Sequence, residues 1–171
     1  MKNKLYSINK IPNRQTVKEY KNNKPAKRIN VVSIKMVKED SILYKERKIN
    51  SPSDAAKIAK NFLFKSDREQ LIVICLDTKN QPIAINVVSV GTLSSSLVHP
   101  REVFKPAILS NSASIILSHN HPSGDCTPSS EDISVTARIK ESGKLLGIEL
   151  LDHIIIGDMD GYISVKEKGI L

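Results

Sequence analysis

The stretch that most constrains the fold is residues 113–132, which passes from an apolar run into a helix start. Residues 113–118 (ASIILS) contain three consecutive aliphatic side chains, which is typical of a strand buried on both faces. Thr127 can act as an N-cap, and Pro128 fits the first helical position that follows it. We expect this helix to end at Gly147, a residue suited to the C-terminal cap. The sequence therefore predicts a strand, a loop and a helix in immediate succession.

Two histidines lie where the strand is expected to end. His119 and His121 are one residue apart, and alternate residues of an extended chain point to the same side. Asp132 follows 11 residues later, in the first turn of the predicted helix, where the helix dipole favours a carboxylate. Two imidazole nitrogens and one carboxylate form the ligand set of a catalytic zinc site, with the fourth position left for water. The spacing therefore predicts an open, three-ligand metal site.

Apolar segments and turn-forming segments alternate along the rest of the chain. The strand at 83–90 should run antiparallel to the strand at 71–76, because only a short turn separates them. Strands and helices do not alternate strictly, so we expect an α/β fold in the broad sense (α+β) with a mixed, mostly antiparallel sheet flanked by helices. Helices are expected at 53–65, at 100–110 and after Thr127, and strands at 29–36, 41–44, 71–76, 83–90, 113–118, 150–156 and 161–165.

The wider pattern around the histidines resembles a known family of metalloenzymes. It consists of His119-x-His121-Pro122, six residues, Ser129, two residues and Asp132. An isolated H-x-H pair would more often be two loop histidines that bind nothing, but five fixed residues match by chance only about once in a million positions. The pattern is similar to the JAMM/MPN (Mov34-type) motif. The flanks more specifically resemble the RadC branch, in VHPREVF (98–104), HNHPSGD (119–125), TPS (127–129), GI (147–148) and LDHIIIG (151–157).

The resemblance covers residues 50–171 and implies an MPN/cytidine-deaminase-like architecture. It also implies a zinc-dependent hydrolase that uses metal-activated water to cleave a peptide or isopeptide bond in an unknown peptide or protein substrate. His119, His121 and Asp132 would be the Zn²⁺ ligands. In such enzymes a glutamate ahead of the first core strand is the general acid/base, and a serine matching Ser129 helps to hold the oxyanion. A catalytically inactive MPN scaffold is the alternative, but such members usually lose ligands, and the ligand set here is complete.

Two glutamates compete for the position of the general base. Glu69 precedes the strand at 71–76, and we prefer it because that position suits a base acting on the bound water. Glu102 is the alternative, on the helix before the histidine strand, where it can equally be a surface carboxylate beside Arg101. Ser129 also has a second interpretation as a helix-start serine, and the two roles can coexist.

Four other polar residues near the motif have less specific roles. Cys126 is a candidate fourth, inhibitory ligand, although a free small residue in a turn is the better interpretation. Asp152 and His153 either support the ligands from behind or form a satisfied pair in the core. His99, before Pro100, is expected to be a turn residue.

The positive charge of the chain is confined to its first 28 residues. Residues 1–28 hold nine Lys/Arg and one acidic residue, whereas residues 29–171 hold 17 of each sign. We expect 1–28 to be a disordered basic leader ahead of a domain at 29–171, because they are rich in Lys and Asn and lack periodicity. The alternative is a leader that binds nucleic acid by counterion release. The protein would then be a nucleic-acid-associated accessory protein, of DNA repair or of a mobile element, whose RadC-like domain binds metal but need not cleave anything. Full-length RadC proteins carry a helix-hairpin-helix-like domain ahead of this one, and the leader does not resemble it.

Cysteine usage and hydropathy bear on the cellular compartment. Cys75 and Cys126 form neither a CxxC pair nor a disulfide framework, so we expect reduced thiols and a cytoplasmic location. No apolar run approaches the roughly 18 residues that a membrane-spanning helix needs. We therefore expect no membrane association.

Overall fold

The computed structural model describes residues 29–45, 47–63, 66–91, 98–158 and 161–171. The chain divides into two units, Met1–Ser33 and Ile34–Leu171. The described part of the first unit, residues 29–33, is exposed and contains no helix or strand. The leader expected at 1–28 lies outside the described residues. Within the described residues, no helix is both long enough and apolar enough to cross a membrane.

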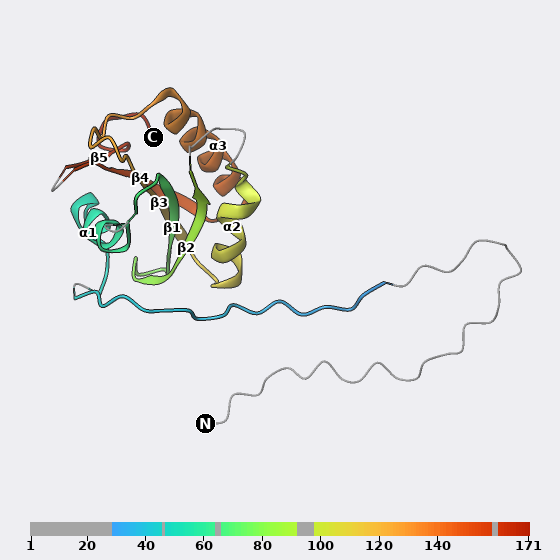
Figure 1. Ribbon diagram of the computed structural model, residues 1–171. Coiled ribbons are helices and arrows are strands. Elements are labelled where there is room, and N and C mark those ends of the chain that lie inside the picture. Colours follow the sequence, from blue (N-terminus) through green and yellow to red (C-terminus); the bar gives the residue numbers. More distant parts are fainter. Residues whose placement is uncertain (1–28, 46, 64–65, 92–97, 159–160) are drawn as a thin grey trace, which may run out of the picture. The chain divides into compact units, whose positions relative to one another are not determined.

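The described part of the second unit contains three helices and five strands around one sheet (Figure 1). The strand order is β2-β1-β3-β4-β5, in which β3 and β4 are parallel and the other neighbours are antiparallel. The expected mixed, mostly antiparallel sheet flanked by helices is therefore confirmed. In chain order the elements are α1 (Pro52–Leu63), β1 (Gln70–Leu76), β2 (Pro82–Val90), α2 (Pro100–Leu109), β3 (Ser114–Asn120), α3 (Ser130–Leu146), β4 (Glu149–Ile156) and β5 (Tyr162–Ser164).

Helices cover both faces of the sheet, which explains the continuous apolar runs of the central strands. Alternate residues of β1, such as Leu71 and Val73, pack with α2 and α3 on one face. The intervening residues, such as Ile72 and Ile74, pack with α1 on the other face. Both β1 and β3 are therefore buried on two sides, and their sequences show no polar alternation.

The register of the central strands places the histidines at one end of the sheet. Leu71 is the partner of His119, and this is the last pair of the antiparallel β1–β3 ladder. Continuing the same register by two residues sets Glu69 opposite His121, on the same face of the sheet. His119 also shares its face with Leu117, which packs with the α3 side of the core. The first turn of α3 therefore approaches the histidines from that face.

Two predicted strands are wrong. Residues 29–36 and 41–44 contain no strand, and aliphatic side chains such as Ile29, Val31 and Leu43 are 91%, 84% and 96% exposed. β-branched residues favour a pleated, half-buried surface, but a strand also needs a neighbour to pair with. None of the five described strands pairs with these segments. The composition therefore indicated a β preference that no strand pairing fulfils among the described residues.

The start of α3 also differs from the prediction. Ser129, not Thr127, is the N-cap, and the helix begins at Ser130. The backbone N–H of Thr127 donates to the Asp125 side chain instead, at 2.9 Å, so Thr127 belongs to the preceding turn. The other expected helices and strands agree with the observed ones to within one or two residues, except that residues 64–65 of the first helix lie outside the described residues.

Candidate metal centre

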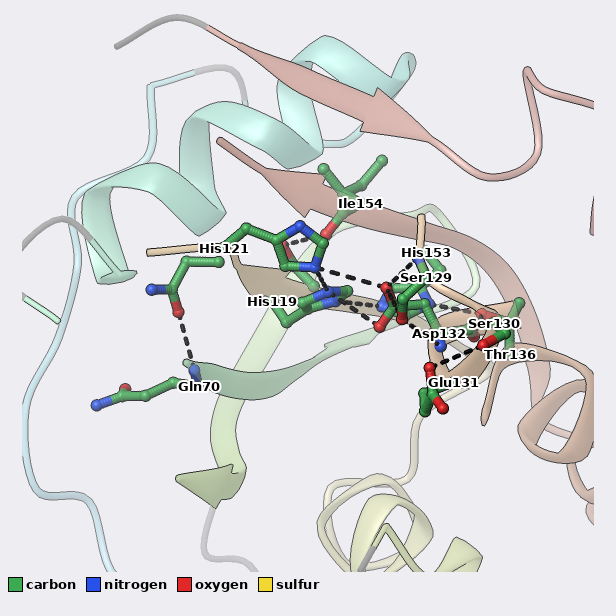
Figure 2. A network of polar contacts seen from close by, with 12 residues as sticks. Gln70, His119, His121, Ser129, Ser130, Glu131, Asp132, Thr136, His153 and Ile154 are labelled. Carbon is green, nitrogen blue, oxygen red and sulfur yellow. Dashed lines mark hydrogen bonds and ion pairs between the residues drawn. The ribbon is translucent and has the colours of Figure 1, made fainter. Parts of the chain in front are cut away.

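The side chains of His119, His121 and Asp132 converge where β3 ends and α3 begins (Figure 2). The two imidazole Nε2 atoms are 2.9 Å apart. One carboxylate oxygen of Asp132 lies 3.1 Å from Nε2 of His119, and the other lies 3.5 Å from Nε2 of His121. His119 and Asp132 are almost fully buried, whereas His121 is partly exposed. The three residues that the spacing predicts as ligands are therefore brought together, with access from the side of His121.

A backbone carbonyl group fixes the tautomer of His121. The Nδ1 atom of this ring lies 2.6 Å from the carbonyl oxygen of Asp125, and a carbonyl oxygen can only accept. The proton of a neutral His121 ring is therefore on Nδ1, and the lone pair is on Nε2, which faces the other two side chains. The loop at 121–125 thus orients one nitrogen lone pair so that it can bind a metal ion.

A longer chain of hydrogen bonds fixes the tautomer of His119 in the same way. It ends at the backbone carbonyl of Asp132, which accepts from the Thr136 hydroxyl at 2.6 Å. Because that hydroxyl donates there, it accepts from Nδ1 of His153, also at 2.6 Å. Nε2 of a neutral His153 then carries a lone pair and accepts from Nδ1 of His119 at 2.8 Å. The Nε2 of His119 is therefore left with a lone pair directed at the centre.

Burial supports the neutral form of His153. Removal from water is the largest effect, and it holds the pKa of His153 well below its usual value. A neutral ring can accept from His119 and donate to Thr136 at the same time. The hydrogen bonds of His153 therefore orient the His119 ring.

The arrangement fits a metal ion. Two nitrogen lone pairs and a carboxylate at these short separations repel one another unless positive charge lies among them. Ligand atoms held tetrahedrally at about 2.0–2.1 Å from an ion lie about 3.3–3.4 Å from each other, close to the separations here. The donor set of imidazole nitrogen and carboxylate oxygen suits a divalent transition metal.

Asp132 is held by a capping box at the start of α3. The Ser129 backbone N–H and hydroxyl both donate to Oδ2 of Asp132, at 2.8 and 2.7 Å, and the Asp132 N–H donates back to the hydroxyl at 3.1 Å. Burial by itself raises the pKa of Asp132, but the hydrogen bond and charge attraction of His119 in its protonated form, together with the bonds from Ser129, outweigh it and lower the pKa. The carboxyl group is therefore ionised and oriented as a ligand.

Glu69 joins the same cluster, whereas Glu102 does not. One ligand atom from each of Glu69, His119, His121 and Asp132 lies within 4.8 Å of the others. Glu102 lies on α2 and is paired with Lys105 at 2.6 Å and with Arg101 at 3.3 Å. It is absent from the metal-binding cluster found among the described residues. The structure thus brings the preferred candidate to the centre, and its role as a base stays a prediction.

Of the four other polar residues considered in the sequence, one supports a candidate ligand directly and three do not. His153 is hydrogen-bonded to His119, one of the candidate ligands. The carboxylate of Asp152 has a different role. It accepts from the backbone N–H groups of His153 and Lys166 and from the Ser164 hydroxyl, and these bonds connect β4 to the segment after it. Cys126 is a free cysteine beside Gly157 and is outside the cluster of candidate metal ligands found among the described residues. His99 is the exposed N-cap residue of α2.

Sequence reasoning missed two residues of this centre. Thr136 carries the hydrogen-bond chain between His153 and Asp132, and Asn120 binds the backbone around Glu69. A threonine four residues after Asp132 in a helix is the available signal for the first, because its hydroxyl reaches the carbonyl one turn earlier. Asn120 lies between the two histidines, but only the strand register reveals its partners.

Comparison with known proteins shows which family this chain belongs to. A family model described as the RadC-like JAB domain matches residues 49–170. This chain belongs to the RadC-like JAB domain family. UPF0758 proteins from Desulfitobacterium hafniense, Rubrobacter xylanophilus and Methanosarcina mazei are 59%, 54% and 53% identical to it over 123, 123 and 124 residues. These alignments cover 72% of this chain and 53–54% of each relative. The RadC-like JAB domain described here thus spans about half the length of the curated relatives it matches, and the suspected RadC resemblance is confirmed.

Proposed function

We propose that this protein is a zinc-dependent hydrolase of the JAMM type that cleaves a peptide or isopeptide bond with activated water. The observation that carries the proposal is the convergence of three electron-pair donors, from His119, His121 and Asp132, with Glu69 beside them. Two nitrogens and one carboxylate are a common ligand set for catalytic zinc, and they leave a coordination position for water. A closed structural site would use four protein ligands.

Each residue has a distinct part in this proposal. A zinc ion held by His119, His121 and Asp132 would lower the pKa of bound water and polarise the substrate carbonyl. Glu69 takes a proton from the attacking water and delivers it to the leaving nitrogen, so that the C–N bond breaks after the C–O bond forms. Ser129 is the candidate oxyanion donor. Its hydroxyl hydrogen is directed at Asp132, so it has to turn toward the substrate to fill that role.

Metal analysis of the purified protein tests the first half of the proposal. The wild type is expected to bind one equivalent of zinc, and the His119→Ala/His121→Ala variant is expected to bind none, because only one of the three ligands remains. His99→Ala is the matched control, since His99 is exposed at the start of α2, and it should bind zinc like the wild type. A wild-type protein that cannot be loaded with zinc contradicts the proposal.

Incubation of the zinc-loaded protein with a random peptide library and with isopeptide-linked model peptides tests the second half. Cleavage detected by mass spectrometry, and lost in the His119→Ala/His121→Ala variant, is the expected result. Zinc binding without any cleavage would leave a metal-binding domain that is not a hydrolase.

We also propose that residues 1–28 bind nucleic acid. The supporting observation is their excess of nine basic residues over one acidic residue, in a chain that is otherwise neutral. Counterion release makes such binding fall with salt, with a slope of about 0.9 for each phosphate that the protein neutralises on duplex DNA.

Fluorescence anisotropy with a DNA duplex at several salt concentrations tests this second proposal. Replacing four leader lysines, Lys18, Lys21, Lys24 and Lys27, by Gln in the full chain is expected to reduce the slope by about 0.9 for each phosphate that is no longer neutralised. Gln at Lys140 and Lys144 of α3 is the control and should leave the slope unchanged. Binding that does not depend on salt contradicts the proposal.

A further inference from the structure

The residue between the two histidines has hydrogen bonds that the metal centre does not use. Asn120 is the last residue of β3, and its side chain is 9% exposed. Its Oδ1 accepts from the backbone N–H of Gln70 at 2.9 Å, a bond that Figure 2 shows at the Gln70 nitrogen. Its Nδ2 donates to the backbone carbonyl of Arg68 at 3.0 Å. One side chain therefore binds the two peptide groups that flank Glu69.

The chemistry of these hydrogen bonds specifies an amide side chain at position 120. A backbone N–H can only donate and a backbone carbonyl can only accept, so the partner needs one acceptor and one donor a short distance apart. A carboxylate lacks the donor, and an aliphatic side chain lacks both. The two partners also fix which end of the amide is oxygen, because only one orientation satisfies Gln70 and Arg68 together.

The side-chain amide of Asn120 provides the hydrogen bonds to the β1 segment beyond the end of the β1–β3 backbone ladder. The last backbone pair is Leu71 with His119, and Glu69 lies just before the first residue of β1. On its other side, the carbonyl oxygen of Glu69 accepts from the N–H of Gly91, after β2, at 2.8 Å. The backbone around Glu69 is thus bound from both sides, and on the β3 side the bonds come from Asn120.

We propose that Asn120 is a positioning residue that holds Glu69 over the metal ligands by clamping the peptide groups on either side of it. The inference rests on the proposed role of Glu69 as the base. The residues at the end of β3 then have two different roles. His119 and His121 point to the metal, and Asn120 between them fixes the backbone of Glu69. A general base needs this fixation, since proton transfer requires a reach of about 2.6–3.2 Å between heavy atoms.

Asn120→Ala in the full chain tests the clamp. The backbone amide of Gln70 is expected to exchange its hydrogen with solvent about 10-fold faster or more, measured by nuclear magnetic resonance, because its acceptor is gone. Zinc affinity should stay within about threefold of the wild type, since no ligand is touched. Hydrolysis of p-nitrophenyl acetate by the zinc-loaded protein should fall about 10-fold to 100-fold, as for other groups that orient a reacting residue.

Ser118→Ala is the matched control, because Ser118 lies two residues earlier on β3 and its buried hydroxyl donates to the carbonyl of Ile154 at 2.7 Å. It removes a hydrogen bond of similar kind but leaves the Glu69 segment untouched. We expect no change in Gln70 exchange and no more than a twofold change in hydrolysis, about the scatter of a neutral substitution. Asn120→Asp serves if Asn120→Ala does not fold, because its carboxylate keeps the acceptor for Gln70 but loses the donor to Arg68 and sets a negative charge beside that carbonyl. Hydrolysis should then fall while the exchange of the Gln70 amide stays slow.

The double variant Asn120→Ala/Glu69→Gln separates positioning from general damage. If Asn120 acts through Glu69, the double variant is no slower than Glu69→Gln alone, because residues that act as a unit are not additive. A further drop by the full factor of Asn120→Ala overturns the proposal. Unchanged Gln70 exchange in Asn120→Ala also overturns it. If the wild type shows no zinc-dependent hydrolysis, the proposed function fails, and the exchange measurement still decides the clamp.

Discussion

Replacing Glu69 by Gln is expected to lower turnover by a factor of about 10²–10⁴ while the protein keeps its zinc. Gln has nearly the shape of Glu but cannot take a proton from water. The Glu69 carboxylate lies within 4.8 Å of the other three ligand atoms, which places it in reach of a water bound among them. His119, His121 and Asp132 still supply three ligands in this variant. The measurement is zinc content beside the rate of peptide or p-nitrophenyl acetate hydrolysis.

Glu102→Gln is the matched control for this variant. Glu102 is on α2 and pairs with Lys105, and its pKa is lowered by that hydrogen bond, so it resembles an ordinary surface carboxylate. Its removal should leave both zinc and turnover unchanged, because a surface ion pair contributes little. The opposite pattern, with Glu69→Gln active and Glu102→Gln inactive, would show that the base has been assigned to the wrong glutamate.

The part of the centre that sequence predicts is the part encoded locally. His119 and His121 share a face because a strand alternates, and Asp132 points back because it is the third residue of a helix. Neither deduction needs knowledge of the rest of the fold. Glu69 is different, since it joins the cluster only through the β1–β3 register. Its selection relied on family resemblance, and the register supplies the physical reason.

The features that sequence did not predict depend on distant partners. His153 and His119 are 34 residues apart, and Asn120 and Gln70 are 50 apart, so no local pattern pairs them. The strand expected at 29–36 failed for the converse reason, because β propensity states a preference and does not supply a neighbour. The sequence offers two N-caps for α3, Thr127 and Ser129. The structure uses Ser129, because Ser129 and Asp132 form a capping box that stabilises the helix start more than the Thr127-Pro128 pair does.

The fixed tautomers have an energetic consequence for the metal-free protein. Both Nδ1 atoms act as hydrogen-bond donors, so the two Nε2 lone pairs and the Asp132 carboxylate face one another without a hydrogen between them when the rings are neutral. In that state the two Nε2 lone pairs have no hydrogen-bond donor, which costs stability. The arrangement of these side chains therefore lowers the stability of the metal-free fold, as is common for functional sites.

Asp132→Asn is accordingly expected to abolish zinc binding and yet stabilise the metal-free protein. The Asn oxygen can keep the bonds from Ser129, while its NH₂ group faces Nε2 of His119, 3.1 Å away, and can donate to it. The new hydrogen bond contributes about 1 kcal/mol. Loss of the favourable helix dipole interaction costs about 0.3–1 kcal/mol. A net gain of about 0.5 kcal/mol corresponds to a rise in Tm of about 1–2 °C for a chain of this size.

Thermal unfolding with a chelator at pH 8 measures this effect. Zinc affinity should fall by more than the roughly 100-fold seen for supporting residues, since a ligand is lost. Asp152→Asn is the matched control, and it is expected to lower the stability of the protein instead of raising it. Asp152 accepts from three donors, so an NH₂ group there breaks a buried bond and costs about 1–3 kcal/mol. If both variants are destabilised alike, the His119 and His121 lone pairs are not strained against Asp132, and the hydrogen-bond directions inferred for the centre are wrong.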